Sequence, residues 1–251
     1  AHRPMLLGGA GLGLLSVGGR GKSLDVEIRG RDSLLDRRSQ RLAFRLTVDG
    51  APLLDDLDER PATDDGWDLA TASHNTVVVN GLNQRETPQA ARTPAPGSDF
   101  LYFAADPDFQ VAAVADRYAY PTSTSRYRQT FLVSGWGRRR YALSIFEVEG
   151  GVQHDQIFHA ASGRRERWRP NAATIPAAGS LLPPSIPFLS PAKPEEGRWF
   201  VQAYGEFRPR HRAEVTGPSR VDLGLGDGSP PALRLHLLGD SPATLVTAES
   251  A

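Results

Sequence analysis

The chain of 251 residues is long enough to bury a hydrophobic core, and 39% hydrophobic against 23% charged residues is typical of a folded globular protein. Lysine plus arginine and aspartate plus glutamate number 29 each, so the formal net charge is zero and a nucleic-acid partner is not indicated. The absence of cysteine excludes disulfides, thiol nucleophiles and cysteine-ligated zinc. The 25 glycines and 20 prolines disfavour long helices and favour short strands joined by turns.

The apolar runs of the chain are short. No stretch approaches the roughly 18 consecutive apolar residues of a transmembrane helix, so no membrane partner is expected. The glycine-rich run Met5–Val17 lacks the basic flank and cleavage site of a signal peptide, and is predicted to form a first strand or hairpin. The chain ends directly after a strand-like segment, so we expect it to be a piece of a longer protein.

Candidate strands follow one another about every ten residues. Leu24–Arg29 alternates apolar and polar residues, and Arg41–Val48 does so more clearly, with Leu42 and Phe44 on one face and Arg41 on the other. Asp49-Gly50 and Asn80-Gly81 are pairs that tolerate positive φ in tight turns. Further strands are predicted at Thr76–Val79, Phe100–Ala104, Phe109–Asp116, Tyr127–Val133, Tyr141–Val148, Gln156–His159, Trp199–Tyr204, His211–Thr216, Leu233–Leu238 and Thr244–Thr247.

The segments between these strands lack a sustained helical period. Asn83–Ser98 is polar with three prolines and is predicted to be a loop. Pro170–Pro194 holds seven prolines and is predicted to be a second, proline-rich loop. The fold class is therefore all-β: one large antiparallel β-sandwich of the supersandwich kind, as a single domain over residues 1–251.

Four stretches carry a family resemblance. Ala72–Gln84 reads A-S-H-N-T-V-V-V-N-G-L-N-Q. It resembles the S-H-N-T-V-x-V-D/N-G-x-x-Q signature of the heparinase II/III-like polysaccharide lyases, in their β-sandwich part. Arg41–Leu54 resembles the family's R-L-S-F-x-L-x-x-D-G-x-P-L-L hairpin, Tyr127–Thr130 fits the strand that follows, and Tyr141–His159 resembles a strand ending in G-G-x-x-H-D followed by F-H. Together they cover about residues 36–160, in family order.

The resemblance implies a function as well as a fold. Family members cleave acidic, uronic-acid polysaccharides by β-elimination: a base removes the C5 proton beside a carboxyl group, and an acid protonates the leaving oxygen. Full-length members carry an α/α-toroid of helices before the sandwich, and we expect that toroid to be the partner domain missing from this chain. Such enzymes are bacterial and periplasmic or secreted. In the family, a zinc ion is held by an H-x-H pair, an aspartate and the histidine of S-H-N-T.

The family's metal site is only partly matched. His74 stands at the last zinc ligand and Asp56 at the aspartate, whereas Asp36 stands where the family has its catalytic histidine and Arg38 where it has a zinc-binding histidine. A guanidinium has no lone pair for a metal. The metal set is thus reduced to Asp56 and His74, and no cofactor is expected in this chain. We expect Arg38 to take the cation's place, paired with Asp56.

Each candidate site residue has a structural alternative. His74 and its neighbour Asn75 either contact metal or substrate, or are buried and stabilise the hairpin. Trp168, flanked by Arg165 and Arg167, suits a sugar ring stacked on the indole with its anion gripped by guanidinium forks, or belongs to a solvated loop. Two functions follow: part of a lyase, with this chain inactive alone, or a non-catalytic carbohydrate-binding or scaffold module.

Overall fold

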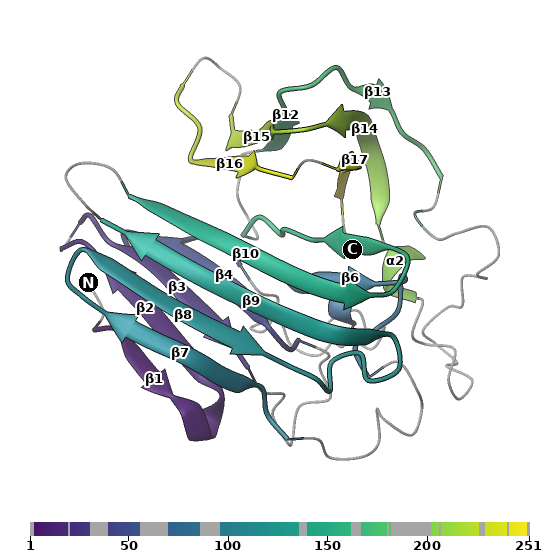
Figure 1. The fold of residues 1–251 in the computed structure, drawn as a ribbon. Helices are drawn as coiled ribbons and strands as arrows, with labels where there is room; N and C mark the ends of the chain where they lie inside the picture. The colour runs from purple at the N-terminus through teal and green to yellow at the C-terminus, as the bar shows by residue number, and fades with distance from the viewer. Residues whose placement is uncertain are drawn as a thin grey trace. The chain divides into compact units, whose positions relative to one another are not determined.

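The computed structural model describes residues 3–19, 21–30, 40–55, 70–85, 96–135, 140–161, 167–179, 181, 202–205, 207–225, 229–239 and 241–249. They are almost entirely antiparallel strands, which confirms the all-β prediction (Figure 1). The chain divides into two compact units. The first comprises residues 1–161 and 189–203, and the second residues 162–188 and 204–251. Whether the two units fold as a single domain stays a prediction.

The first unit begins with a five-stranded antiparallel sheet in chain order. Its strands are β1 (Met5–Leu7), β2 (Leu12–Val17), β3 (Leu24–Arg29), β4 (Ala43–Val48) and β5 (Ala51–Leu54). The 3-10 turn η1 (Gly8–Ala10) joins β1 to β2, so the hairpin predicted over this apolar run is confirmed. Asp49 and Gly50 connect β4 to β5 at φ values of 53° and 80°, as their turn chemistry predicts.

A four-stranded sheet with the order β10-β9-β8-β7 packs on the first (Figure 1). Its strands are β7 (Asp99–Ala105), β8 (Phe109–Ala115), β9 (Thr124–Ser134) and β10 (Tyr141–Gly150). The rings of Phe44 and Phe131 meet across the interface at 4.9 Å between centroids. The buried Gln110 amide exchanges two 2.6 Å hydrogen bonds with the main chain of Ser16. Aromatic packing and a buried polar contact thus join the two layers of the sandwich.

A small third sheet lies beside the sandwich and holds the signature segment. It pairs β6 (Val77–Val79) with β11 (His154–Gln156), and the 3-10 turn η4 (Thr71–Ser73) precedes β6. The strand predicted at Gln156–His159 therefore starts and ends earlier. The reason is that the main chain at His159 leaves the ladder to bond the Asn75 side chain.

The second unit contains two three-stranded antiparallel sheets. One has the order β12-β15-β16 and the other β13-β14-β17. The strands are β12 (Arg167–Pro170), β13 (Ile175–Pro176), β14 (Arg208–Thr216), β15 (Ser219–Gly224), β16 (Leu233–Leu237) and β17 (Pro242–Glu249).

Two sequence predictions are corrected in this unit and next to it, and one strand of the unit was not predicted. The start of the proline-rich loop forms β12 and β13, where Pro170 and Pro176 close strands at sheet edges, positions that tolerate a missing N–H. Residues 182–194 of that loop lie outside the described residues. Strand β15 was not predicted. The strand predicted at Trp199–Tyr204 is replaced, in its described part, by the one-turn helix α2 (Gln202–Gly205), because Tyr204 packs on Phe207 three residues later. Among the described residues, no helix has the length and apolarity to cross a bilayer.

Candidate functional site

The signature segment forms a buried hairpin in the first unit. Asn80 and Gly81 turn the chain at φ values of 56° and 69°, and Leu82 bridges back to Val79. Apart from Asn80 in the turn, the polar side chains of the signature are at most 2% exposed; these are Ser73, His74, Asn75, Thr76, Asn83 and Gln84. Polar groups removed from water in this way need partners inside the protein. The signature therefore acts first as a structural junction.

Asn75 ties three segments of the first unit together. Its Nδ2 donates to the carbonyls of Phe44 (3.0 Å) and Asp55 (2.8 Å), and its Oδ1 accepts the His159 N–H (2.6 Å). All three partners are main-chain groups, on β4, just after β5 and just after β11. The bonds occupy both amide hydrogens, so a contact of Asn75 with substrate, which stays a prediction, requires this clamp to open.

His74 is fully buried directly after η4. A buried histidine bonded to the hairpin backbone was the structural alternative for His74. His159 has this role in the structure, because its Nε2 donates to the Ala72 carbonyl at 2.8 Å. Asp55 is held beside this region by the Asn75 amide and by a 2.7 Å ion pair with Arg45. The main chain immediately before Asp56 therefore runs next to the neighbour of His74. Whether Asp56 itself reaches His74 stays a prediction.

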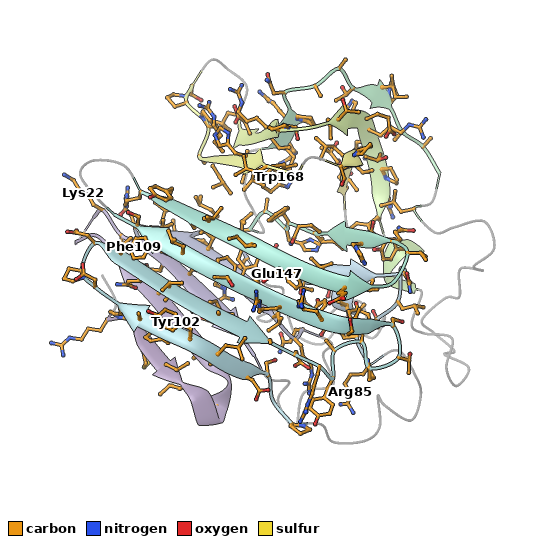
Figure 2. The ribbon with its side chains drawn as sticks, viewed as in Figure 1. Lys22, Arg85, Tyr102, Phe109, Glu147 and Trp168 are labelled. Carbon is orange, nitrogen blue, oxygen red and sulfur yellow. The ribbon has the colours of Figure 1, made fainter. Side chains whose placement is uncertain are left out.

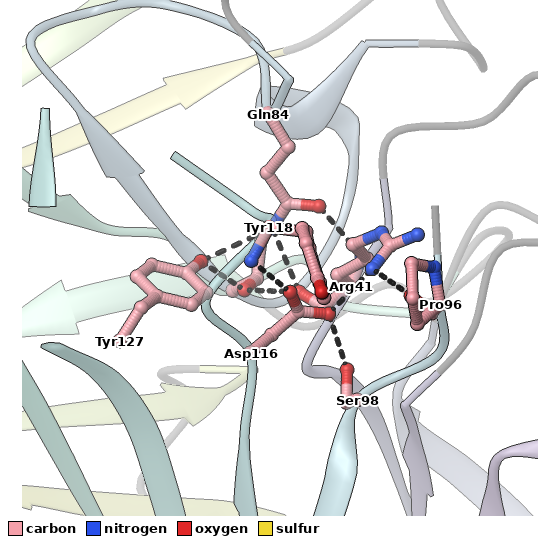
Figure 3. A network of polar contacts seen from close by, with 8 residues as sticks. Arg41, Gln84, Pro96, Ser98, Asp116, Tyr118 and Tyr127 are labelled. Carbon is pink, nitrogen blue, oxygen red and sulfur yellow. Dashed lines mark hydrogen bonds and ion pairs between the residues drawn. The ribbon is translucent and has the colours of Figure 1, made fainter. Parts of the chain in front are cut away.

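A buried ion pair lies behind the signature (Figure 3). Arg41 Nη1 and Asp116 Oδ2 are 2.7 Å apart, with 2% and 0% of their side chains exposed. Asp116 also accepts hydrogen bonds from the Ser98 hydroxyl (2.5 Å) and the Tyr118 N–H (2.7 Å). Alternation along the predicted strand set Arg41 on the face opposite Leu42 and Phe44, but all three residues are buried. The partner of Arg41, Asp116, is 75 residues away, so a pattern of neighbouring residues cannot predict the pair.

Gln84, the last residue of the signature, links this pair to the second sheet. Its Oε1 accepts the Arg41 N–H and its Nε2 donates to the Arg41 carbonyl, both at 2.7 Å, as a strand would. The same Nε2 donates to the Tyr127 hydroxyl at 3.1 Å, and that hydroxyl donates to the Val77 carbonyl at 2.6 Å. Thr76 Oγ1 lies 3.0 Å from the hydroxyl. The network thus joins the start of β4, the signature hairpin and β9 (Figure 3).

Tyr127 illustrates the chemistry of this network. Burial raises the pKa of its phenol far above the ordinary value, an effect that its hydrogen bonds with Thr76 and Gln84 only partly oppose. A general base needs a pKa near the working pH. Tyr127 is therefore held neutral as a hydrogen-bond donor to a carbonyl, which is a structural role.

The predicted arginine–tryptophan cluster is only partly described. Arg167 and Trp168 begin β12, which pairs with β15, and Trp168 is labelled in Figure 2. Neighbouring side chains of a strand point to opposite faces. Arg167 is exposed, whereas Trp168 is half-buried opposite Leu223, which is fully buried. Arg167 and Trp168 therefore point to opposite faces of β12, so they cannot bind one sugar from the same face, contrary to the prediction from the sequence.

The remaining predicted site residues lie outside the described residues: Asp36, Arg38, Asp56 and Arg165. Among the described residues, no three histidine, aspartate or glutamate side chains converge as metal ligands. His74 is the one described member of the family's zinc set, and a single imidazole does not define a zinc site.

Comparison with known proteins shows which solved structures have a similar fold. No protein-family model and no curated protein matches the sequence. Among solved structures, heparan sulfate lyase HepC from Pedobacter heparinus is similar, with a TM-score of 0.50 at 11% sequence identity. The match covers 96% of this chain and 33% of HepC, so this chain spans about a third of the length of that structure. The fold of the chain is thus distantly similar to part of a polysaccharide lyase.

Proposed function

We propose that this chain is the β-sandwich part of a polysaccharide lyase that acts on acidic polysaccharides. The observation that carries the proposal is the structural similarity to a heparan sulfate lyase along 96% of the chain. The family-like order of the signature, the preceding hairpin and the following strand supports it from the sequence. Substrates of this class lie outside the cytoplasm, so we also propose a periplasmic or secreted location.

The proposed reaction is β-elimination at a uronic acid. A base removes the proton on C5, the C4–O bond breaks, its electron pair leaves with the oxygen, and that oxygen takes a proton. The product carries a C4–C5 double bond. We propose that the complete acid and base set needs a second domain of the α/α-toroid kind. In this chain, Asp36 replaces the family's histidine, and the described signature residues hold the fold.

A non-catalytic carbohydrate-binding or scaffold module is the second candidate. It is favoured by Arg38 at a zinc-ligand position and by the complete burial of His74 and Asn75. Under this proposal, the site keeps its fold but has lost its catalytic and metal-binding residues, and an Arg38–Asp56 ion pair takes the place of the metal.

Release of unsaturated uronate, followed by its ultraviolet absorbance, separates the two candidates. The purified chain and the complete natural product of its gene are each assayed on heparin, heparan sulfate, alginate and hyaluronan. We expect product from the complete protein and none from the chain alone, because a missing general base costs about 10²–10⁴-fold in rate. Binding without product from either protein would instead support the module. Product from the chain alone, lost in a folded His74→Gln variant, would overturn the proposed inactivity.

A further inference from the structure

One face of the β12-β15-β16 sheet in the second unit gathers arginines. The register sets Arg169 on β12 opposite Asp222 on β15, and Asp222 opposite Arg234 on β16. Residues directly opposite in an antiparallel sheet share a face. The three residues therefore form one row across the sheet. The Asp222 carboxylate pairs with Arg234 in this row and with Arg220 two residues along β15, whereas the Arg169 guanidinium donates to the Leu225 carbonyl.

A second row lies two residues along the strands. Arg220 is directly opposite His236, and Asn171, just beyond the end of β12, donates its N–H to the Arg220 carbonyl at 2.8 Å. Asn171, Arg220 and His236 line a surface hollow of about 400 Å³. On β12, Arg167 is two residues from Arg169 and shares its face, opposite the side-chain-free Gly224. The rows place four arginines and one histidine on a single face.

The opposite face of the same sheet is apolar. Val221 and Leu223 of β15 are 9% and 0% exposed, and Trp168 and Leu233 flank Leu223 on the neighbouring strands. Alternation along the strands therefore turns the apolar side chains into the unit and the arginines outward, with 37% of the Arg220 and 45% of the Arg234 side chain exposed.

The charges on the outward face do not cancel. Its described residues carry four guanidinium groups and one carboxylate, an excess of three positive charges on a chain whose formal net charge is zero. Arg234 binds Asp222 in a two-point contact (3.0 and 3.3 Å), and this bond lowers the pKa of Asp222 so that it stays ionised. The nearby Glu249 of β17 is paired with Arg210, which lowers its pKa in the same way.

We propose that this face binds a sulfated or carboxylated polysaccharide. The choice of polysaccharide rests on the proposed function, whereas the site itself rests on charge complementarity. Guanidinium forks bind sulfate and carboxylate groups in two-point contacts. With strands about 4.8 Å apart and alternate residues about 6.8 Å apart, the array extends about 10 Å across and about 14 Å along the sheet. Such an array suits anions repeated along a linear chain, and Asp222 fixes Arg234 before binding.

Heparin binding to the full chain, measured by calorimetry over a series of salt concentrations, tests the site. In Arg169→Gln/Arg234→Gln, we expect affinity to fall about tenfold, because two exposed guanidinium contacts are lost. The salt dependence should become shallower, since fewer counterions are released. The matched control is Arg126→Gln, which removes an exposed, ion-paired arginine from β9 of the first unit and should leave affinity unchanged.

The outcomes separate this site from the proposed function. Arg169→Lys/Arg234→Lys restores the charge without the fork, so it should recover part of the affinity. Circular dichroism of both variants tests whether a loss of affinity reflects unfolding. Unchanged heparin affinity in the glutamine variant would overturn the site and leave the proposed function standing. No binding of heparin, heparan sulfate, alginate or hyaluronan by the unmodified chain would count against both. Tighter binding of an oligonucleotide of equal charge would overturn the polysaccharide as ligand.

Discussion

Replacing Asn75 by alanine tests whether the signature is a structural junction. The substitution removes three hydrogen bonds to main-chain groups: those of Phe44 and His159, which are buried, and that of Asp55, which is half-buried. Each intramolecular bond contributes about 0.5–1.5 kcal/mol, and a buried group left without a partner costs about 1–3 kcal/mol. We expect the free energy of unfolding to fall by about 3 to 5 kcal/mol, a large part of the stability of an ordinary domain.

The measurement is urea unfolding followed by circular dichroism, with Gln156→Ala as the matched control. Gln156 is an exposed amide on β11, and its side chain makes only long hydrogen bonds of 3.3 and 3.4 Å. Its truncation should change stability by less than about 0.5 kcal/mol. Asn75→Asp keeps an acceptor for the His159 N–H but loses both donors, so it should be no more stable than the alanine variant.

A small loss of stability in Asn75→Ala would refute the structural role of the three Asn75 hydrogen bonds. If Asn75→Ala lost less than about 1 kcal/mol at an unchanged urea slope while polysaccharide binding weakened, the amide would be serving a ligand rather than the fold. Because the side chain is wholly buried, such a result would also require the hairpin to open during binding.

Local patterns predicted most of the sandwich. Leu24–Arg29 was predicted with the bounds of β3, and both Asp-Gly and Asn-Gly turns adopt positive φ, because these features depend on neighbouring residues. The same local patterns could not predict features that depend on residues far away in the sequence. Leu42 was predicted to lie within its strand, but it adopts φ of 56° and the strand starts at Ala43, next to the Arg41 contacts with Gln84 and Asp116.

The candidate sites depended even more on distant pairing. The resemblance singled out Asn75 for chemistry, but whether its amide faces a ligand or three main chains is decided by segments up to 84 residues away. Of the basic face of the second unit, the sequence singled out only Arg167. The rest was missed because the arginines come from three strands, β15 was not predicted, and a net charge of zero gave no sign of it. Alternating polar residues in Ser219–Gly224 were the available signal.

Three further predictions concern the buried network and the metal. Asp116→Asn leaves the Arg41 charge buried without its ion partner, so unfolding free energy should fall by about 3–5 kcal/mol in urea; a loss below about 1 kcal/mol would contradict the pair's role. Elemental analysis of chain purified without chelator should find far less than one zinc per chain, since Asp56 and His74 are only two ligands; near one per chain would refute this. The last concerns alkaline pH and Tyr127. Because burial raises the pKa of its folded-state phenol above the ordinary 10.0, only the unfolded chain ionises this group just above that pH. The contribution of the neutral phenol to the free energy of unfolding is thus complete below about pH 10. It falls as pH rises further, by about 1.4 kcal/mol per pH unit. Tyr127→Phe is less stable at neutral pH but has no phenol to ionise. Its free energy of unfolding, measured by urea unfolding at each pH, should therefore fall less steeply from pH 10 to 11. Parallel curves for the two proteins would show that the phenol is not held neutral by the fold.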